Sequence, residues 1–340
     1  MQLTAEKTQP ACPVIEPVRF LCYYGKKQNG AQCPGKEASS WREKKEMNII
    51  EAENLKKNYG ELTAVNGISF AVKKGSMLGF LGVNGAGKTT VINMLSTLLK
   101  PDGGKVTICG ETLGKGDESI RKKIGIVYQQ NCLDDILTVQ ENLMCRGMIH
   151  GATRAEAKER FGSLTEILKL KDIIKKKYRT LSGGQKRRCE IAAALMHTPE
   201  ILFLDEPTTG LDPATRIEVW KTIAELQKTE KMTVFLTTHY MEEAAGAEQI
   251  VIMDHGSIIA SGTPFALKEK YAKDKLKLYY RNGRTEEITI PATLEALPVL
   301  EKEKEKISGF EVILGNMDDV FLNAVGMPDG EETKYGEGTK

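Results

Sequence analysis

The chain has 340 residues, of which 41% are hydrophobic and 28% are charged, a composition typical of folded globular proteins and not of disordered ones. The 48 basic and 46 acidic side chains leave a net charge of +2, which argues against nucleic acid as a partner. We find no apolar run of the roughly 18–20 residues that cross a bilayer, and the N-terminus lacks the basic-then-apolar order of a signal peptide.

The seven cysteines predict reduced thiols in a cytosolic protein. Their number is odd, no two of them are separated by only two residues, and the chain is far longer than a disulfide scaffold. Cys12, Cys22 and Cys33 lie near one another, but a closed zinc site takes four ligands in tight pairs. We therefore expect no metal site at these cysteines.

The first 46 residues differ in composition from the rest of the chain. They hold four of the twelve prolines and three of the seven cysteines, without sustained periodicity. We predict that residues 1–46 are a disordered tail or an over-extended start, with Met47 as the natural first residue. From Met47 onward, the rough alternation of residues 48–55 is typical of a strand.

Residues 47–264 are predicted to form one α/β domain. Apolar runs bounded by turns and separated by helices are typical of a parallel sheet that is covered on both faces. After Pro264 the chain is rich in Lys and Glu, which predicts a small C-terminal domain over residues 265–340. The expected strands are residues 76–81, 105–108, 124–128, 201–204, 234–236, 250–253 and 286–290, and the expected helices are residues 88–99 and about 139–170.

A glycine-rich segment between a predicted strand and a predicted helix matches the phosphate-binding pattern G-x-x-x-x-G-K-[ST]. Glycines let backbone N–H groups converge on phosphate oxygens, and the following helix adds the positive end of its dipole. We expect Lys88 to reach the β- and γ-phosphates and the Thr89 hydroxyl to hold Mg²⁺. The predicted nucleotide-binding residues here are Gly82, Val83, Asn84, Gly85, Ala86, Gly87, Lys88, Thr89 and Thr90.

Two carboxylates follow the apolar run of residues 201–204. Asp205 and Glu206 stand at the carboxyl end of a predicted central strand, where ligands gather in open α/β sheets. Asp205 suits Mg²⁺, bound through water, and Glu206 suits the attacking water, as its general base or as the group that orients it. Either carboxylate could instead cap a helix, but the phosphate-binding loop upstream favours the catalytic interpretation.

A second helix start with exposed backbone N–H groups precedes that strand. Ser182 is a good N-cap, two glycines expose N–H groups, and the apolar residues 191–195 continue the helix. Such a start can bind an anion, although an ordinary capped helix has the same pattern. The segment reads Leu181, Ser182, Gly183, Gly184 and Gln185.

Taken in order along residues 47–264, these segments resemble the ATP-binding subunit of ATP-binding cassette (ABC) transporters, whose signature is LSGGQ. The resemblance implies ATP hydrolysis with ATP and Mg²⁺ as cofactors. It also implies a P-loop NTPase core of the α/β class, with an antiparallel β subdomain and a helical subdomain at about residues 135–182. The small C-terminal appendage would then be α+β.

The resemblance implies roles for four residues outside these segments. Gln129 matches the Q-loop glutamine, which contacts Mg²⁺ and the membrane partner, and His239 matches the switch histidine at the γ-phosphate. Tyr59 matches the aromatic residue that stacks on adenine, and Asp212 matches the D-loop aspartate. The implied catalytic residues are Glu206, His239 and Gln129, and the implied Mg²⁺ ligands are Thr89, Gln129 and Asp205.

In this family the signature loop of one subunit closes over ATP bound to the phosphate-binding loop of another. Residues 181–185 are therefore expected to bind the ATP of a partner subunit, in a homodimer or a heterodimer. Loss of the γ-phosphate removes charge that one face holds, so the dimer can open. We expect the chain to work at the cytoplasmic face of the cell membrane, as the peripheral partner of a separate polytopic permease.

Among ABC proteins, the sequence looks most like the drug-resistance branch of bacterial and archaeal exporters. The features are residues 133–139, 262–264 and 317–322, although Tyr128 stands where a proline often precedes the Q-loop glutamine. The alternative is a soluble ABC ATPase in a nucleic-acid process or an assembly process such as iron–sulfur biogenesis. The segment between Lys88 and Ser182 is too short for the coiled coil of DNA-repair members. Translation factors of the family carry two cassettes, whereas this chain carries one. The C-terminal extension disfavours an adaptor ATPase of an assembly process.

Overall fold

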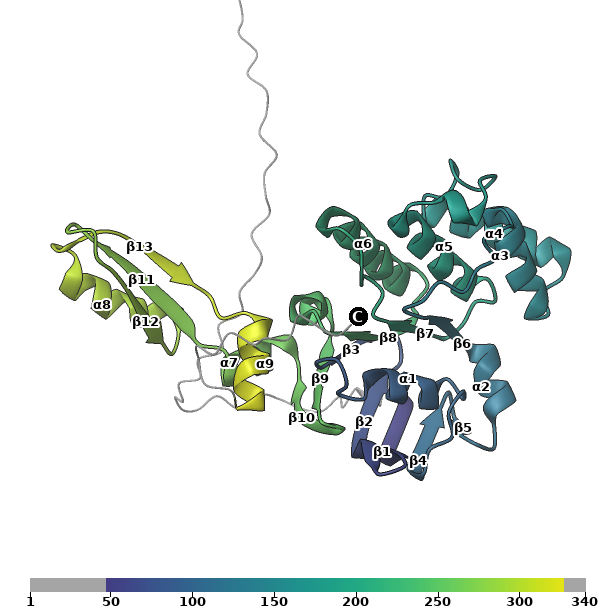
Figure 1. Ribbon diagram of the computed structural model, residues 1–340, viewed down its shortest axis with the longest axis horizontal. Helices are drawn as coiled ribbons and strands as arrows, with labels where there is room; N and C mark the ends of the chain where they lie inside the picture. Colours follow the sequence, from purple (N-terminus) through teal and green to yellow (C-terminus); the bar gives the residue numbers. More distant parts are fainter. Residues whose placement is uncertain (1–46, 327–340) are drawn as a thin grey trace, which may run out of the picture. The chain divides into compact units, whose positions relative to one another are not determined.

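The computed structural model describes residues 47–326, so the predicted tail at residues 1–46 lies outside the described residues. A six-stranded sheet lies at the centre of the larger part of the fold (Figure 1). Its strands in spatial order are β10 (Ser257–Gly262), β9 (Gln249–Asp254), β3 (Met77–Leu81), β8 (Thr233–Thr238), β7 (Ile201–Asp205) and β6 (Ile124–Val127). All neighbours pair in parallel except β10, which is antiparallel to β9. The predicted parallel sheet is confirmed, with the strands predicted at residues 76–81, 124–128, 201–204, 234–236 and 250–253. The strand predicted at residues 105–108 is also present, but it lies in a separate antiparallel sheet.

Helices cover both faces of this sheet. Along β7, Ile201 and Phe203 enter one hydrophobic core, and Leu202 and Leu204 enter another, because successive side chains of a strand point to opposite faces. The first core includes α1 (Lys88–Leu95), and the second includes α5 (Gly183–Leu195) and α6 (Pro213–Thr229). Figure 1 shows α1 on one side of the sheet and α5 and α6 on the other. Coverage on both faces is therefore confirmed.

A second, antiparallel sheet packs against the face that carries α1. Its strands in spatial order are β2 (Leu62–Lys73), β1 (Asn48–Tyr59), β4 (Gly103–Ile108) and β5 (Glu111–Thr112), and α2 (Asp117–Lys123) follows it in the chain. Ile50 and Leu55 of β1 and Val106 of β4 lie in the same core as α1. The strand predicted at residues 48–55 is therefore confirmed, and it continues to Tyr59.

The helical stretch predicted at residues 139–170 is two helices, α3 (Val139–Ile149) and α4 (Arg154–Ile167), followed by the short η1 (Tyr178–Thr180). Gly151 has a φ of 90°, and Thr153 caps α4 by accepting a hydrogen bond from the Glu156 N–H. The left-handed conformation of Gly151 prevents α3 from continuing, and the Thr153 cap starts α4. The helix predicted at residues 88–99 ends earlier, at Leu95, since Thr97 has a left-handed φ of 66°.

The C-terminal part of the described chain holds a third sheet. It contains β12 (Thr285–Ile290), β11 (Asp274–Tyr280) and β13 (Ile307–Ile313), all antiparallel, and β12 confirms the strand predicted at residues 286–290. Leu276, Leu278, Ile290 and Ala296 form its core. The other elements are η2 (Met241–Gly246), α7 (Pro264–Tyr271), η3 (Thr293–Glu295), α8 (Ala296–Glu303) and α9 (Met317–Val325).

The last described helix, α9, belongs to the main core rather than to this small sheet. Met317, Val320 and Phe321 are buried in the same cluster as Ala244 of η2 and Leu267 of α7. Within the described part of the chain, no helix is both long and apolar enough to cross a bilayer.

Candidate active site

The glycine-rich loop between β3 and α1 packs tightly against its neighbours. A Cβ on Gly82 would lie 2.4 Å from the Met253 carbonyl oxygen, and one on Gly87, whose φ is 106°, would lie 2.4 Å from the Ala64 carbonyl oxygen. Glycine at both positions therefore lets the loop backbone approach β2 and β9. The loop ends where α1 begins, at Lys88, as expected.

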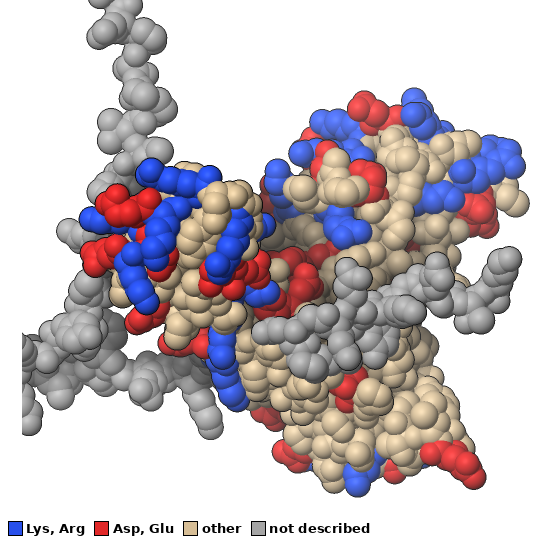
Figure 2. Space-filling model, turned by 60° about the vertical axis from the view of Figure 1, so that its left-hand side comes forward, with Lys and Arg blue, Asp and Glu red and all other residues tan. Residues whose placement is uncertain are grey.

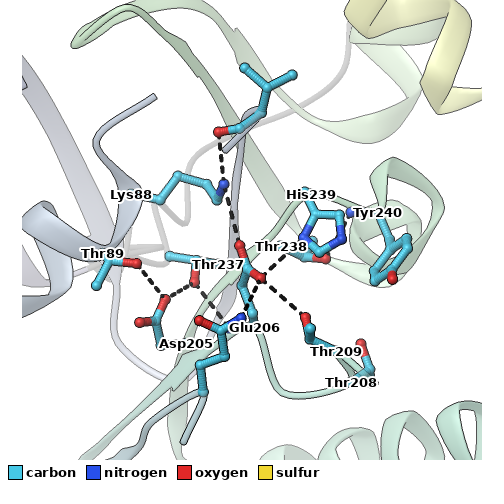
Figure 3. A network of polar contacts seen from close by, with 12 residues as sticks. Lys88, Thr89, Asp205, Glu206, Thr208, Thr209, Thr237, Thr238, His239 and Tyr240 are labelled. Carbon is cyan, nitrogen blue, oxygen red and sulfur yellow. Dashed lines mark hydrogen bonds and ion pairs between the residues drawn. The ribbon is translucent and has the colours of Figure 1, made fainter. Parts of the chain in front are cut away.

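The Lys88 side chain points back into this loop. Its Nζ donates to the Gly82 carbonyl at 2.7 Å and to the Val83 carbonyl at 3.1 Å, and it lies 3.5 Å from Oε1 of Glu206 (Figure 3). Lys88 is only 4% exposed, and burial lowers the pKa of its ammonium group, although the Glu206 carboxylate opposes that shift. The loop thus holds a buried cation where phosphate oxygens can take over as its partners.

Asp205 is the last residue of β7 and lies beside α1. Its Oδ1 accepts hydrogen bonds from the hydroxyls of Thr237, at 2.7 Å, and Thr89, at 3.3 Å. Burial raises the pKa of this carboxyl group, while the two hydroxyls oppose the shift. A cation bound here would favour its charged form.

Glu206 adopts a left-handed backbone conformation, with a φ of 47°. For a residue with a side chain this conformation costs on the order of 1 kcal/mol, so the surroundings must hold it. Its N–H donates to the Thr237 carbonyl at 3.1 Å, and its own carbonyl accepts from Nη2 of Arg187 at 3.0 Å. The resulting turn lets two adjacent carboxylates face different partners, Asp205 toward Thr89 and Glu206 toward Lys88 (Figure 3).

The Glu206 carboxylate joins the residues to which the resemblance assigns catalysis. Its Oε2 lies 3.1 Å from Nδ1 of His239, which follows β8, and accepts a hydrogen bond from the Thr209 hydroxyl at 3.1 Å. The same oxygen accepts a longer hydrogen bond, at 3.4 Å, from Nε2 of Gln129, which follows β6. Three segments far apart in the sequence therefore meet at one carboxylate.

A second layer of contacts lies behind His239. The Tyr240 ring lies 4.0 Å from the His239 ring, and the Arg216 guanidinium lies 4.0 Å from the centre of the Tyr240 ring. Glu243 accepts hydrogen bonds from the hydroxyls of Thr208, at 2.5 Å, and Thr238, at 2.7 Å. These contacts tie the segment around His239 to the turn that follows Glu206.

An open cleft of about 530 Å³ connects the loop to the end of β1. Tyr59, the last residue of β1, is half-exposed at 49% and lines this cleft. The predicted site residues that line it are Tyr59, Asn84, Gly85, Gly87, Lys88, Thr89, Thr90, Gln129 and Glu206. The geometry suits a ligand with a flat ring at one end and phosphates at the other.

The signature segment lies elsewhere. Ser182 caps α5, as expected: its Oγ accepts from the Gln185 N–H at 3.4 Å, and the Gln185 side chain accepts from the Ser182 N–H at 3.1 Å. A Cβ on Gly184 would lie 2.2 Å from Cγ2 of Thr215 in α6, whose N-cap is Asp212. Of the described residues, those that line the cleft include neither the signature segment nor Asp212.

The donor set suits Mg²⁺. This ion takes hard oxygen ligands and usually keeps several waters. Thr89 offers a hydroxyl, Asp205 a carboxylate whose charged form burial disfavours, and Gln129 an amide oxygen. The predicted ligands thus have the chemistry that the ion requires.

Sequence reasoning gave no role to the hydroxyls of Thr237 and Thr209 or to Arg187 and Glu243. Thr237 is the second-last residue of the buried strand β8, and a polar residue near the end of an apolar strand is a signal that the sequence contains. The partners of Arg187 and Glu243 lie on other elements, so no local pattern could have found them.

Charged side chains of both signs share the surface. On the face that Figure 2 shows, Lys and Arg are interspersed with Asp and Glu in the upper part of the view, and the lower part is mostly uncharged. Among the described residues on this face, basic side chains form no continuous surface of the kind that follows a nucleic-acid backbone.

Comparison with known proteins gives a consistent set of relatives. Residues 65–209 match the family described as ABC transporter. The linearmycin resistance ATP-binding protein of Bacillus subtilis is 46% identical over 229 residues, covering 67% of this chain and 73% of that protein. The daunorubicin/doxorubicin resistance ATP-binding protein of Streptomyces peucetius is 36% identical over 307 residues, covering 82% of this chain and 93% of that protein. Nod factor export ATP-binding protein I of Rhizobium sp. is 42% identical over 223 residues, covering 65% and 73%.

Solved structures give the same result. The structure of cbiO1 from Clostridium perfringens, part of the ABC transporter complex cbiONQ, matches with a TM-score of 0.61 and 31% identity, covering 66% of this chain and 93% of that one. The ATP-binding cassette MJ0796, solved as a dimer in a post-hydrolysis state with ADP and Pi, matches with a TM-score of 0.58 and 28% identity, covering 64% and 99%.

Proposed function

The chain belongs to the ABC transporter family, as the ATP-binding and ATP-hydrolysing subunit of an export system, and from this premise we propose how its residues carry out the reaction. Subunits of this family dimerise and act with a membrane permease. We propose that the permease here is a separate polytopic chain and that this chain docks on it from the cytoplasmic face. The named relatives are proteins of linearmycin resistance, daunorubicin/doxorubicin resistance and Nod factor export, which supports a small-molecule cargo.

ATP is proposed to lie in the cleft, with its adenine on Tyr59 and its phosphates in the loop of residues 82–90. The cleft joins these two features in one space, and its loop offers backbone N–H groups at the start of α1. Lys88 then exchanges its carbonyl partners for oxygens of the β- and γ-phosphates. Because its charge is buried, its attraction to phosphate is less screened than at the surface.

Mg²⁺ is proposed to be held by Thr89, Asp205 and Gln129. Bound there, the ion would neutralise charge on the phosphates of ATP. Thr237 fixes Asp205 through its hydroxyl, so the carboxylate is oriented by strand β8 as well as by its own strand.

Glu206 is proposed to accept a proton from the attacking water or to orient that water. The observation that carries this assignment is the meeting of Lys88, His239 and Gln129 at its carboxylate, with distances between 3.1 and 3.5 Å. His239 can donate a hydrogen bond to the γ-phosphate through its imidazole N–H. Glu206 is 7% exposed, so bulk water does not compete strongly for its carboxylate.

The signature segment and Asp212 are proposed to act on the ATP of a second subunit. They pack against each other through Gly184 and Thr215 but do not line the cleft of their own subunit. This placement supports an arrangement in which two copies enclose ATP between a loop and a signature helix.

We also propose residues 47–264 as the ATP-binding domain, with α3, α4 and η1 in its helical subdomain at about residues 135–182, and residues 265–340 as an appendage.

The test is ATP hydrolysis by the full chain with Lys88→Ala. The substitution removes the buried cation, and we expect turnover to fall by about a hundredfold or more, measured as phosphate release. Lys122→Ala is the matched control, because Lys122 is exposed and pairs only with Glu118 four residues away among its described contacts. Near-normal hydrolysis by Lys88→Ala would contradict the proposed site.

A further inference from the structure

Arg187 is a buried arginine of α5 that the proposed reaction does not use. It is 5% exposed and lies five residues after Ser182, on the helix that the signature segment begins. Its guanidinium donates three hydrogen bonds to main-chain carbonyls: Nε to Pro207 at 2.5 Å, Nη1 to Tyr128 at 2.6 Å and Nη2 to Glu206 at 3.0 Å.

These carbonyls belong to the two segments that carry the reaction. Tyr128 directly precedes Gln129, and Glu206 and Pro207 form the turn whose left-handed φ of 47° must be held by its surroundings. The side chains of Gln129 and Glu206 meet at 3.4 Å. One guanidinium therefore fixes the main chain on both sides of that contact.

The same helix holds the other side of the Gln129 segment. Glu190, one turn after Arg187, accepts hydrogen bonds from the N–H groups of Cys132, at 2.9 Å, and Leu133, at 3.2 Å. It also accepts a hydrogen bond from the Tyr178 hydroxyl at 2.7 Å. The chain from residue 128 to residue 133 is thus attached to α5 before and after Gln129.

Only arginine has the geometry for these three contacts. Its planar group carries five N–H donors in a fixed fork, whereas lysine has a single ammonium group on a flexible stem. Burial removes the Arg187 guanidinium from water and lowers its pKa, and the three carbonyl partners compensate for the lost contacts with water. Arg188, the next residue, is only partly buried.

We propose that Arg187 is a positioning residue for ATP hydrolysis. It holds Glu206 in its turn with Gln129 beside it, and it ties the placement of both to the helix that begins at the signature segment. The proposal rests on the proposed function, since it acts through Glu206. It assigns Arg187 no contact with ATP.

The experiment compares Arg187→Lys and Arg187→Gln with Arg188→Gln in the full chain. Because the residues proposed to bind ATP are unchanged, we expect kcat to fall by about tenfold or more while KM for ATP changes by less than about threefold. Arg188→Gln should stay within about twofold of the unaltered chain in both constants. Thermal unfolding identifies the variants that fold.

A second measurement separates positioning from a merely structural role. In single-turnover hydrolysis, Arg187→Lys should slow the Glu206→Gln chain by a clearly smaller factor than it slows the unaltered chain, since the carboxylate is gone and only the effect of Arg187 through the Gln129 segment remains. A loss of folded protein would instead multiply with the Glu206→Gln defect.

The outcomes are distinct. Folded Arg187 variants with a kcat within twofold of the unaltered chain would overturn the positioning role. So would an Arg187→Lys substitution that slows single-turnover hydrolysis by the same factor in the Glu206→Gln chain as in the unaltered chain. Failure of both Arg187 variants to fold would also overturn it, because the residue would then serve the fold. An unaltered chain that hydrolyses ATP no faster than Lys88→Ala would refute the proposed function itself.

Discussion

At the scale of single residues, Gly184 occupies a place that has no room for a side chain. A Cβ there would lie 2.2 Å from Cγ2 of Thr215, and the Thr215 side chain cannot easily turn away because its hydroxyl is bonded to Asp212 at 2.6 Å. An added methyl group must therefore move α5 or break the cap of α6.

Gly184→Ala should lower the free energy of unfolding by about 1–3 kcal/mol. Thr215→Ser removes the clashing methyl and keeps the hydroxyl, so the double variant should be nearly as stable as Thr215→Ser alone. Denaturant unfolding without nucleotide measures both effects. If Thr215→Ser does not rescue Gly184→Ala, the contact between these two residues is not the cause of the loss.

The site residues that the sequence predicts without the help of a resemblance are those that form contiguous patterns. The glycine-rich loop could be read because Gly82, Gly87 and Lys88 must be close in sequence to surround a phosphate. The contacts of Arg187 could not be predicted from such a pattern, since its partners Tyr128 and Glu206 are 59 and 19 residues away in the sequence. The resemblance named Gln129 and His239, and the structure adds that both contact the Glu206 carboxylate.

At the scale of elements, the sequence predicts buried strands better than it predicts helix ends. The central strands are short apolar runs, because both of their faces are buried. The break between α3 and α4 depends on the conformation of Gly151 and on the capping box of Thr153 and Glu156, which the apolar pattern does not contain. The spacing of apolar residues alone therefore predicts one continuous helical stretch where the structure has two helices.

The contact of α9 with η2 is an element-scale feature that only the structure gives. Met317 is fully buried, and its N–H donates to Oε1 of Glu242 at 2.6 Å, three residues after His239. Val320 and Phe321 extend the contact into the main core. The last described helix therefore packs on the main core, although a separate sheet precedes it in the chain.

Met317→Ala should lower the free energy of unfolding by about 2–5 kcal/mol, because it removes a buried side chain and leaves a cavity. Leu314→Ala is the matched control, since Leu314 is three residues earlier and 63% exposed. Calorimetry should show the main transition shifted by ~2–4 °C per kcal/mol in Met317→Ala. An unchanged main transition would mean that α9 unfolds independently of the core.

At the scale of the whole molecule, the proposed ATP site requires a second copy of the chain. The signature segment, which offers the N-terminus of α5, does not line the cleft of its own subunit. A second copy is proposed to supply it, so that ATP lies between two positive helix ends. Shifting the equilibrium between separate copies and the closed dimer from mostly open to mostly closed takes roughly 5.5 kcal/mol of binding free energy. A few charge-assisted hydrogen bonds to ATP, at ~1.5–3 kcal/mol each, can supply it.

Glu206→Gln should therefore accumulate as an ATP-bound dimer. The amide keeps the shape of the side chain but cannot accept the proton from water, so the γ-phosphate persists and holds the two copies together. Light scattering after chromatography with ATP and Mg²⁺ should report twice the mass of the chain, and ADP should return the monomer. Adding Lys88→Ala should abolish the dimer, because ATP is then no longer held. A Glu206→Gln chain that binds ATP and stays monomeric would contradict the shared site, even if the residues within each copy act as proposed.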